Sequence, residues 1–348
     1  MNILIVRLGA LGDIVHAIPA AAAIRAAMPN ARIDWIVDAR HSPVLELVTA
    51  IDRIVRIHGR GVAAWSDAVR RLRETPYDVA LDLQGLMKSA VLARVSGASR
   101  VAGFSIWHLR EKGARPFYSE TDSAVRLQPD HDNHATEHVI RKNLHLLRIL
   151  GIQTERIEFP IARVPSAVAE MLREQFAAQK FALINPGAAW PNKRWPSDRF
   201  GAVAAFLREV RELQSIVLWG PGEESLAEEV VATSGGAAVL APPTSIHDIS
   251  EIARLADLFV SGDTGPLHIA AAVGTPTVAI FGPTDPARNG PWSAADEIVT
   301  RYDACGCHYD RRCHEGEWCL QSVSVAEVTA AIQQRLGRTV ATRTDGQS

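Results

Sequence analysis

The sequence predicts an α/β protein with two domains, each a parallel sheet covered by helices on both faces. Three observations favour this class: short apolar runs alternate with helix-like segments, the alternation stops near the middle of the chain, and it then restarts. Near-continuous apolar strands are typical of parallel sheets, in which both faces are buried. Since 348 residues suffice for two ordinary domains, we expect two Rossmann-like domains that face one another.

The first half of the chain contains four predicted strands separated by helical patterns. The strands are 2–7, 32–38, 53–58 and 77–83, and the clearest helices are 14–28 and 63–74. Pro19 falls inside the first helix and is expected to kink it. Residues 105–133 show no clear period and are predicted to form a long surface loop. A helix over 135–151 then ends at Gly151.

The second half repeats the pattern after a proline-containing segment, 152–166, that is typical of an interdomain linker. Its predicted strands are 181–187, 215–222, 237–242, 257–265 and 276–284. An amphipathic helix over about 323–336 precedes a polar tail that we expect to be disordered. The predicted domains are therefore 1–160 and 161–336, followed by the tail 337–348.

The composition excludes several classes of protein. A hydrophobic fraction of 47% and a charged fraction of 22% are typical of a soluble globular chain, and a net charge of -2 does not favour nucleic acid as a partner. No apolar run reaches the roughly 18 residues of a membrane span. Arg7, Asp13 and Arg25 interrupt the N-terminal apolar stretch, which argues against a signal peptide. We expect a cytoplasmic protein, at most peripheral to a membrane.

The loop RLGALGD, residues 7–13, follows the first predicted strand. It lacks the third glycine of a dinucleotide fingerprint, and its acid would repel a pyrophosphate. Asp13 could cap the next helix, or it could act as a general base that accepts a proton from a reacting hydroxyl. The two roles are compatible. Ligands of open α/β sheets bind beyond the carboxyl ends of the strands, so we expect the site between the two carboxyl edges.

Two loops of the second domain carry groups suited to a phosphate. Lys193, in the stretch KRW, supplies a point charge for a phosphate oxygen; the alternative is a solvated basic turn with Trp195 packed inside. Further on, Asp263, Thr264 and Gly265 end a strand and open a helix. Backbone N–H groups and the threonine hydroxyl there can bind a diphosphate, and the aspartate can accept hydrogen bonds from sugar hydroxyls.

Three further features admit two interpretations each. His268 is either a site residue or a structural histidine, and Glu224 either binds ribose hydroxyls or is an acid favoured at a helix start. The four cysteines fall together in CGCHYDRRCHEGEWC, at Cys305, Cys307, Cys313 and Cys319. With two histidines nearby they could form a structural zinc site, but the spacing fits no standard zinc signature, so reduced or partly buried thiols are preferred.

Taken together, the motifs resemble the glycosyltransferase family that includes the lipopolysaccharide heptosyltransferases, over nearly the whole chain. The resemblance rests on GDIVHAIPA, DLQGLMKSA, KRWP, WGPGEE and the stretch 261–286. DLQGLMKSA, residues 82–90, is most similar to the heptosyltransferase I branch, which adds the first heptose to the Kdo-lipid A inner core. The implied fold is a GT-B architecture, with the acceptor on the first domain and the donor, ADP-heptose, on the second.

The resemblance also implies roles for individual residues in an inverting, metal-independent transfer that needs no cofactor. Asp13 would be the catalytic base. Lys193 would hold the donor phosphates, Glu224 the adenosine ribose, and Asp263, Thr264, Gly265 and His268 the heptose and diphosphate; Arg60 and Lys88 are weaker candidates for acceptor contacts. No D-x-D motif stands in a suitable loop, since DHD at 130–132 has little else to support it. Such an enzyme would work at the cytoplasmic face of the inner membrane.

Two alternatives stay open. The cysteine stretch is not a hallmark of heptosyltransferase I, which leaves heptosyltransferase II or a family member with another acceptor. A non-catalytic protein that binds a nucleotide sugar is the alternative from another class. A dehydrogenase is disfavoured because no G-x-G-x-x-G opens either half of the chain.

Overall fold

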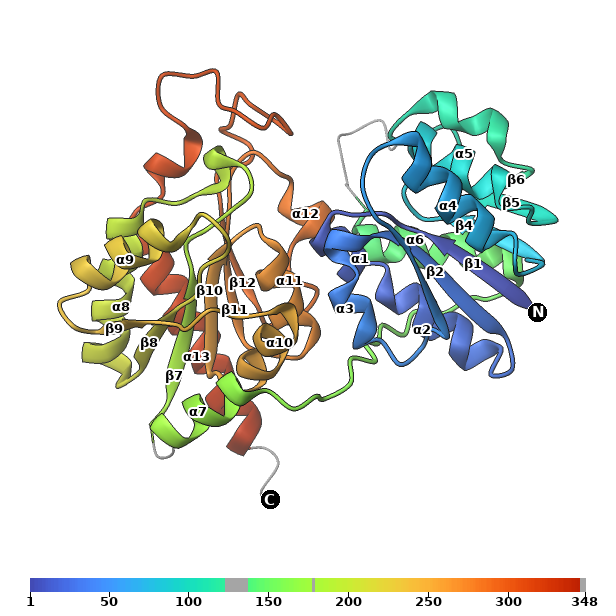
Figure 1. The fold of residues 1–348 in the computed structure, drawn as a ribbon. Helices are drawn as coiled ribbons and strands as arrows, with labels where there is room; N and C mark the ends of the chain where they lie inside the picture. The colour runs from blue at the N-terminus through green and yellow to red at the C-terminus, as the bar shows by residue number, and fades with distance from the viewer. Residues whose placement is uncertain (123–136, 177–178, 345–348) are drawn as a thin grey trace. The chain divides into compact units, whose positions relative to one another are not determined.

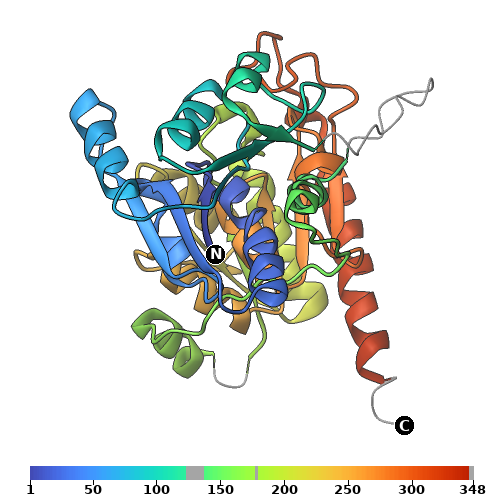
Figure 2. The ribbon, with the colours of Figure 1, turned by 90° about the vertical axis from the view of Figure 1, so that its right-hand side faces the viewer.

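The computed structural model describes residues 1–122, 137–176 and 179–344. The chain divides into two compact units, Met1–Ala162 and Arg163–Ser348 (Figures 1 and 2). Each unit contains a six-stranded sheet in which the paired strands are parallel. The predicted α/β class with two Rossmann-like domains is therefore confirmed.

The sheet of the N-terminal unit has the strand order β3-β2-β1-β4-β5-β6. Its strands are β1 (Asn2–Val6), β2 (Arg32–Asp38), β3 (Arg53–Ile57), β4 (Val79–Asp82), β5 (Arg100–Gly103) and β6 (Glu120–Thr121). This is the strand order of the Rossmann fold, in which the chain changes direction between β1 and β4. The loops that follow these two strands therefore line the place where such sheets bind ligands.

The helices of this unit are mostly short. They are α1 (Leu11–Val15), α2 (Ile18–Ala27), α3 (Pro43–Glu46), α4 (Val62–Leu72), α5 (Met87–Val95) and α6 (Val139–Leu146), with 3-10 turns η1 (Ala39–His41), η2 (Lys112–Phe117) and η3 (Leu147–Leu150). The predicted helix over 14–28 forms as two pieces, because the chain breaks at residues 16–17, close to the kink expected at Pro19. Pro19 is the second residue of α2, where its missing N–H removes no helical hydrogen bond.

The predicted surface loop over 105–133 is only partly described, and the described part is not irregular. Residues 105–122 contain η2 and β6. The prediction is wrong here because three apolar side chains anchor the segment: Leu109, Ala114 and Tyr118 are buried. The stretch DHD at 130–132 lies outside the described residues.

The sheet of the C-terminal unit repeats the same order when its strands are counted from β7. Its order is β12-β11-β10-β7-β8-β9, with β7 (Phe181–Asn185), β8 (Gln214–Val217), β9 (Ala238–Leu240), β10 (Leu258–Gly262), β11 (Thr277–Phe281) and β12 (Glu297–Thr300). β7 and β10 lie side by side in register, with Ile184 opposite Val260. The chain changes direction between them, so the loops after β7 and β10 meet at one edge.

Two layers of helices cover the faces of this sheet. The helices are α7 (Ala167–Gln175), α8 (Ser197–Arg211), α9 (Glu224–Thr233), α10 (Ile246–Leu255), α11 (Gly265–Ala272), α12 (Pro286–Asn289) and α13 (Val325–Thr344), with 3-10 turns η4 (Pro191–Lys193) and η5 (Cys319–Ser322). Helices α8, α9 and α13 supply one apolar cluster, which includes Phe200. Helices α7, α10 and α11 supply the other, which includes Leu267, so both faces are buried.

The C-terminal helix is longer than predicted. We expected it to end near 336 and the tail 337–348 to be disordered, but α13 continues to Thr344. The expectation is wrong for 337–344 because these residues, although polar, contain no proline that would stop a helix, and one glycine does not end it. Among the helices of the described ranges, none combines the length and apolar character that crossing a membrane requires.

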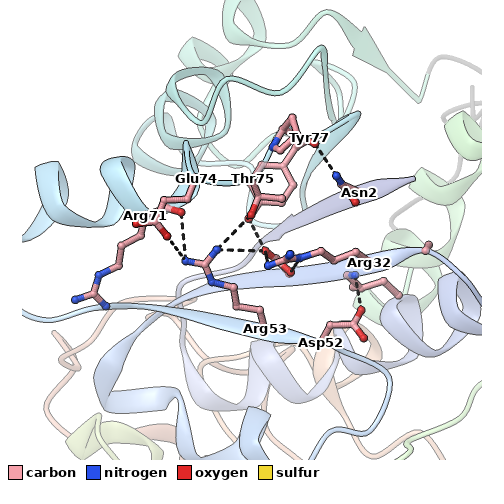
Figure 3. Close-up of polar contacts among 12 residues, drawn as sticks. Asn2, Arg32, Asp52, Arg53, Arg71, Glu74, Thr75 and Tyr77 are labelled. Carbon is pink, nitrogen blue, oxygen red and sulfur yellow. Dashed lines mark hydrogen bonds and ion pairs between the residues drawn. The ribbon is translucent and has the colours of Figure 1, made fainter.

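A polar cluster closes the amino edge of the N-terminal sheet (Figure 3). Asp34 on β2 is fully buried, and the Tyr77 hydroxyl donates to its carboxylate at 2.7 Å. Arg53 donates to Glu74 at 2.9 Å and lies 4.0 Å from Asp34. Burial and the hydrogen bond to Asp34 raise the pKa of Tyr77. Asp34, Arg53 and Glu74 therefore pair with one another at the amino edge of the sheet, opposite the carboxyl edge where the site is expected.

Candidate active site

Asp13 stands at the carboxyl edge of the N-terminal sheet, as the third residue of α1. Its Oδ1 lies 2.8 Å from Nη2 of Arg7, the residue that follows β1. The Arg7 side chain is 6% exposed and that of Asp13 is 25% exposed, so solvent reaches the carboxylate more easily than the guanidinium. Arg7 Nη1 also donates to the carbonyl of Leu83, beyond β4. Arg7 thus ties Asp13 to the point where the chain changes direction.

The loops after β1 and β4 are fastened to each other. Leu8 donates its backbone N–H to Gln84 Oε1 at 2.8 Å. Asp82, at the end of β4, is fully buried. Burial raises the pKa of its carboxyl, although the hydrogen bonds that it accepts act in the opposite direction. Its donors are the Tyr118 and Ser89 hydroxyls and the backbone N–H groups of Gln84 and Gly85. Much of the motif DLQGLMKSA therefore shapes the wall beside the Asp13 loop.

Capping alone does not describe the position of Asp13. The N-cap of α1 is Ala10, and Asp13 lies inside the first turn. A Cβ at Gly9 would lie 2.7 Å from the His41 ring, so any other residue there would displace the imidazole. His41 follows β2 at the same edge. Burial lowers the pKa of His41 below its ordinary value, although the charges of Asp38 and Asp13 act in the opposite direction. Sequence reasoning missed His41, although its place shortly after a strand was visible.

In the C-terminal unit, Asp263 is the centre of a charged cluster at the end of β10. Its carboxylate accepts hydrogen bonds from Lys193 Nζ at 2.5 Å and from the Thr284 hydroxyl at 2.7 Å, and His268 Nε2 lies 3.1 Å from its other oxygen. Burial would raise the pKa of Asp263, but the His268 hydrogen bond and the Lys193 charge hold it far below its ordinary value. The structure therefore brings three of the predicted residues together.

The loop after β7 carries Lys193 to this cluster. Its backbone packs closely on β10, because a Cβ at Gly262 would lie 2.8 Å from the carbonyl oxygen of Lys193. The Lys193 ammonium lies 4.3 Å from the centre of the Trp190 ring, a distance typical of a cation–π contact. Trp195 is buried against Phe200, so the packing role considered for it is correct. The basic turn is not simply solvated, since the Lys193 side chain is 14% exposed.

Thr264 and Gly265 begin helix α11 beside the cluster. Thr264 is its N-cap, and its hydroxyl accepts the N–H of Leu267. Asn185, at the end of β7, donates to the same hydroxyl at 3.3 Å and to Ser261 at 3.1 Å. A helix N-terminus favours negative charge, so this edge combines N–H groups with the Lys193 ammonium. Sequence reasoning missed Asn185 and Thr284, both polar residues at or just after strand ends.

Glu223, the residue before Glu224, contacts the loop after β7, while the ribose role of Glu224 stays a prediction. A Cβ at Gly187, in the loop after β7, would lie 2.1 Å from Glu223 Oε2. Glu223 also accepts from the backbone of Gly220 at 3.3 Å and lies 3.7 Å from Arg194. Its side chain is 19% exposed, whereas Glu224, the first residue of α9, is exposed.

Comparison with known proteins identifies the family to which the chain belongs. A family model described as glycosyltransferase family 9 (heptosyltransferase) matches residues 65–319. The chain belongs to this family. It is thus a glycosyltransferase, and the sequence resemblance is confirmed.

Relatives of this family 9 glycosyltransferase cover most of its length. Lipopolysaccharide heptosyltransferase 1 of Pseudomonas aeruginosa is 29% identical over 309 residues, which cover 84% of this chain and 81% of the relative. A family 9 structure from Veillonella parvula has a TM-score of 0.79 at 22% identity, covering 97% of both chains. Escherichia coli heptosyltransferase WaaC with ADP-2-deoxy-2-fluoro heptose has a TM-score of 0.73 at 20% identity, covering 96% of this chain and 99% of that one. The two structures show a shared GT-B fold.

The two weaker candidates for acceptor contacts in the family 9 enzyme, Arg60 and Lys88, are exposed. Arg60 lies in the loop after β3, and Lys88 is the second residue of α5, so both belong to the carboxyl edge of the N-terminal sheet. Their exposure leaves them available to an anionic ligand. Their role in acceptor binding stays a prediction.

The cysteine stretch of the enzyme is a loop of successive turns and bends that leads into η5. All four thiols are free; Cys305 and Cys307 are buried, and the sulfurs of Cys307 and Cys313 are 3.4 Å apart. Burial raises the pKa of Cys319 to about 12. Over 1–122, 137–176 and 179–344, no group of three His, Cys, Asp or Glu side chains could hold a metal ion. The zinc alternative thus finds no ligand group in this part of the chain.

Proposed function

We propose that this chain transfers heptose from ADP-heptose to the Kdo-lipid A inner core of lipopolysaccharide, with inversion at the anomeric carbon and without a metal. The observation that carries the proposal is a division of chemistry between the two units. The N-terminal unit presents a carboxylate at the end of β1, and the C-terminal unit presents an ammonium beside a helix N-terminus at the ends of β7 and β10. A sugar transfer needs both groups.

The proposed reaction is a direct displacement. The acceptor oxygen forms a bond to the anomeric carbon of heptose, the bond from that carbon to the diphosphate breaks, and ADP leaves with the electron pair. Asp13 takes the proton of the acceptor hydroxyl, which general bases do most effectively when they are fixed in place. Arg7 supplies that fixation as a positioning residue.

The departing diphosphate requires positive charge. We assign this to Lys193 and to the N–H groups at the start of α11, beyond Thr264 and Gly265. Asp263 and His268 would contact the heptose and hold Lys193 in place. An acid beside Gly187 would bind the adenosine ribose; the position of Glu223 favours it over Glu224 for this role.

The printed names of the relatives support the donor and the product class. The Pseudomonas aeruginosa relative is a lipopolysaccharide heptosyltransferase 1, and the WaaC structure holds an ADP-heptose analogue. The first heptose is proposed because DLQGLMKSA is most similar to heptosyltransferase I. Addition of the second heptose is the alternative that the cysteine stretch keeps open.

The test is transfer from ADP-heptose to two acceptors, one without heptose and one already carrying the first heptose, followed by mass analysis of the products. Asp13→Asn should lower kcat by at least about 100-fold while leaving ADP affinity within twofold of wild type. Asp67→Asn, which removes an exposed ion pair with Arg71 on α4, is the matched control and should keep full activity. Unchanged transfer by Asp13→Asn would refute the base assignment. ADP binding without transfer to any acceptor would support the non-catalytic alternative.

A further inference from the structure

The N-terminal unit carries an unusual surface beside its carboxyl edge, on the turn that follows β5. Trp107 is 84% exposed and Ile106 is 43% exposed. Large apolar side chains with this exposure are uncommon in pairs, and a contiguous group of them marks an interaction site more often than scattered ones do. Met87, at the start of α5, is 40% exposed and belongs to the same region.

Backbone hydrogen bonds and buried neighbouring side chains fix the turn that carries Ile106 and Trp107. The backbone N–H groups of His108 and Leu109 both donate to the carbonyl of Ser105. Phe104 and Leu109 are buried and lie next to Gly85, which precedes α5. The exposure of Ile106 and Trp107 is therefore a property of a fixed turn with buried anchors.

The next part of the chain, η2, packs against α5. The sulfur of Met87 lies so close to Gly113 that a Cβ there would be 2.7 Å away. Glu111 accepts the backbone N–H of Met87 at 2.6 Å. Met87, Ile106 and Trp107 thus belong to adjoining surface segments, which we call the Trp107 patch together with the cations Lys88, Arg110 and Lys112.

The charge of the patch is positive. Lys88, Arg110 and Lys112 are all exposed, and Glu111 is the one acid between Phe104 and Tyr118. Because Glu111 accepts from the N-terminus of α5, its charge is partly offset by the helix dipole. Exposed tryptophan and aliphatic side chains surrounded by lysine and arginine are the combination that binds the interface of an anionic bilayer.

We propose that the Trp107 patch docks this enzyme on the anionic phospholipid surface of a membrane. The inference rests on the proposed function in one respect: an acceptor with acyl chains resides in a bilayer, so its sugar must reach Asp13 from that surface. The turn after β5, the start of α5 and Asp13 all belong to the carboxyl edge of one sheet. Docking here would hold this edge near the membrane.

The test is co-sedimentation of the full chain with vesicles, without donor or acceptor. Wild type should bind vesicles of equal parts phosphatidylcholine and phosphatidylglycerol, and bind phosphatidylcholine alone much more weakly. Trp107→Ala should lower the partition coefficient at least about tenfold. Arg110→Glu and Lys112→Glu should each lower it about fivefold or more, with a reduced dependence on salt. Met171→Ala and Arg173→Glu, which alter exposed residues of α7, are matched controls and should bind like wild type.

Activity separates docking from catalysis. Trp107→Ala should transfer normally to a deacylated acceptor and poorly to an acylated acceptor in vesicles. Failure of wild type to bind anionic vesicles, or equal binding by the patch variants, overturns the docking proposal whether or not transfer occurs. Self-association that Trp107→Ala abolishes in the absence of vesicles would instead identify a protein interface and also overturn it. Absence of transfer to the deacylated acceptor would count against the proposed function alone.

Discussion

The ammonium of Lys193 lies 2.5 Å from the carboxylate of Asp263, although 70 residues separate the two in the sequence. The pair is almost fully buried, with side-chain exposures of 14% and 6%. His268 and Thr284 hold the same carboxylate from other directions. Asp263, which we propose as an acceptor for sugar hydroxyls, thus also holds the Lys193 ammonium in its position.

Lys193→Met tests the charge proposed to stabilise the departing diphosphate. We expect kcat/KM for ADP-heptose to fall by about 100-fold to 1000-fold, since one preorganised electrostatic contact contributes this much to a transition state. Single-turnover transfer and calorimetry with ADP measure the effect. Lys180→Met, at an exposed position just before β7, is the control and should behave like wild type. Equal rates for the two variants would exclude a role for Lys193 in the reaction.

Asp263→Asn tests the stability that the cluster contributes. The folded pKa of Asp263 is far below its ordinary value, so its ionised form stabilises the folded unit. This stability is complete above the unfolded pKa of about 3.9 and is lost as the pH falls through the folded pKa. The variant should lose about 3 kcal/mol at neutral pH.

The melting temperatures of wild type and Asp263→Asn, measured across pH, test whether the stability contributed by Asp263 is lost in acid. The gap between them should be constant from neutral pH to about pH 5 and should narrow below about pH 4. Asp198→Asn, at an exposed position on α8, should show no comparable gap. A gap that widens as the solution becomes more acidic would contradict the lowered pKa.

Arg7 variants test whether the guanidinium positions Asp13. Arg7→Met should lower kcat by about 100-fold, a typical cost of a misplaced catalytic group, and leave the KM for ADP-heptose nearly unchanged. Arg7→Lys keeps a charge beside Asp13 but has one nitrogen in place of the two that reach Asp13 and Leu83, so it should recover part of the rate. If Arg7→Met instead raises the KM for ADP-heptose by a similar factor and leaves kcat unchanged, Arg7 acts in ligand binding.

Glu223→Gln and Glu224→Gln form a matched pair that tests the ribose contact. Loss of a hydrogen bond from a sugar hydroxyl to a carboxylate should weaken ADP binding by about tenfold in Glu223→Gln. Glu224→Gln should bind ADP like wild type because Glu224 is exposed at the start of α9. Calorimetry with 2′-deoxy-ADP adds a second measurement. If Glu223 contacts the 2′-hydroxyl, wild type should bind 2′-deoxy-ADP more weakly than ADP. Glu223→Gln should then bind the two nucleotides with equal affinity.

Much of the fold was predictable because its strands are short apolar runs that end in turn residues. Each of the nine strands predicted from such runs overlaps a strand of the structure; 32–38 matches β2 residue for residue. Three short strands, β5, β6 and β12, were missed, since Arg100–Gly103, Glu120–Thr121 and Glu297–Thr300 contain too little apolar sequence to give a pattern. Glu224 was predicted at a helix start, and it is the first residue of α9. Whether Glu224 or Glu223 contacts ribose stays a prediction, because a step of one residue turns a helical side chain by about 100°.

The sequence by itself determined the two α/β halves and the positions of Asp13, Lys193 and Asp263 at strand ends, because strands, turns and helix starts depend on local residue patterns. Only the tertiary structure decided which of these groups meet. β7 pairs with β10 and β1 with β4 through hydrogen bonds between distant segments, and no local pattern encodes those partners. That pairing places Lys193 on Asp263 and gives Arg7 both Asp13 and the carbonyl of Leu83.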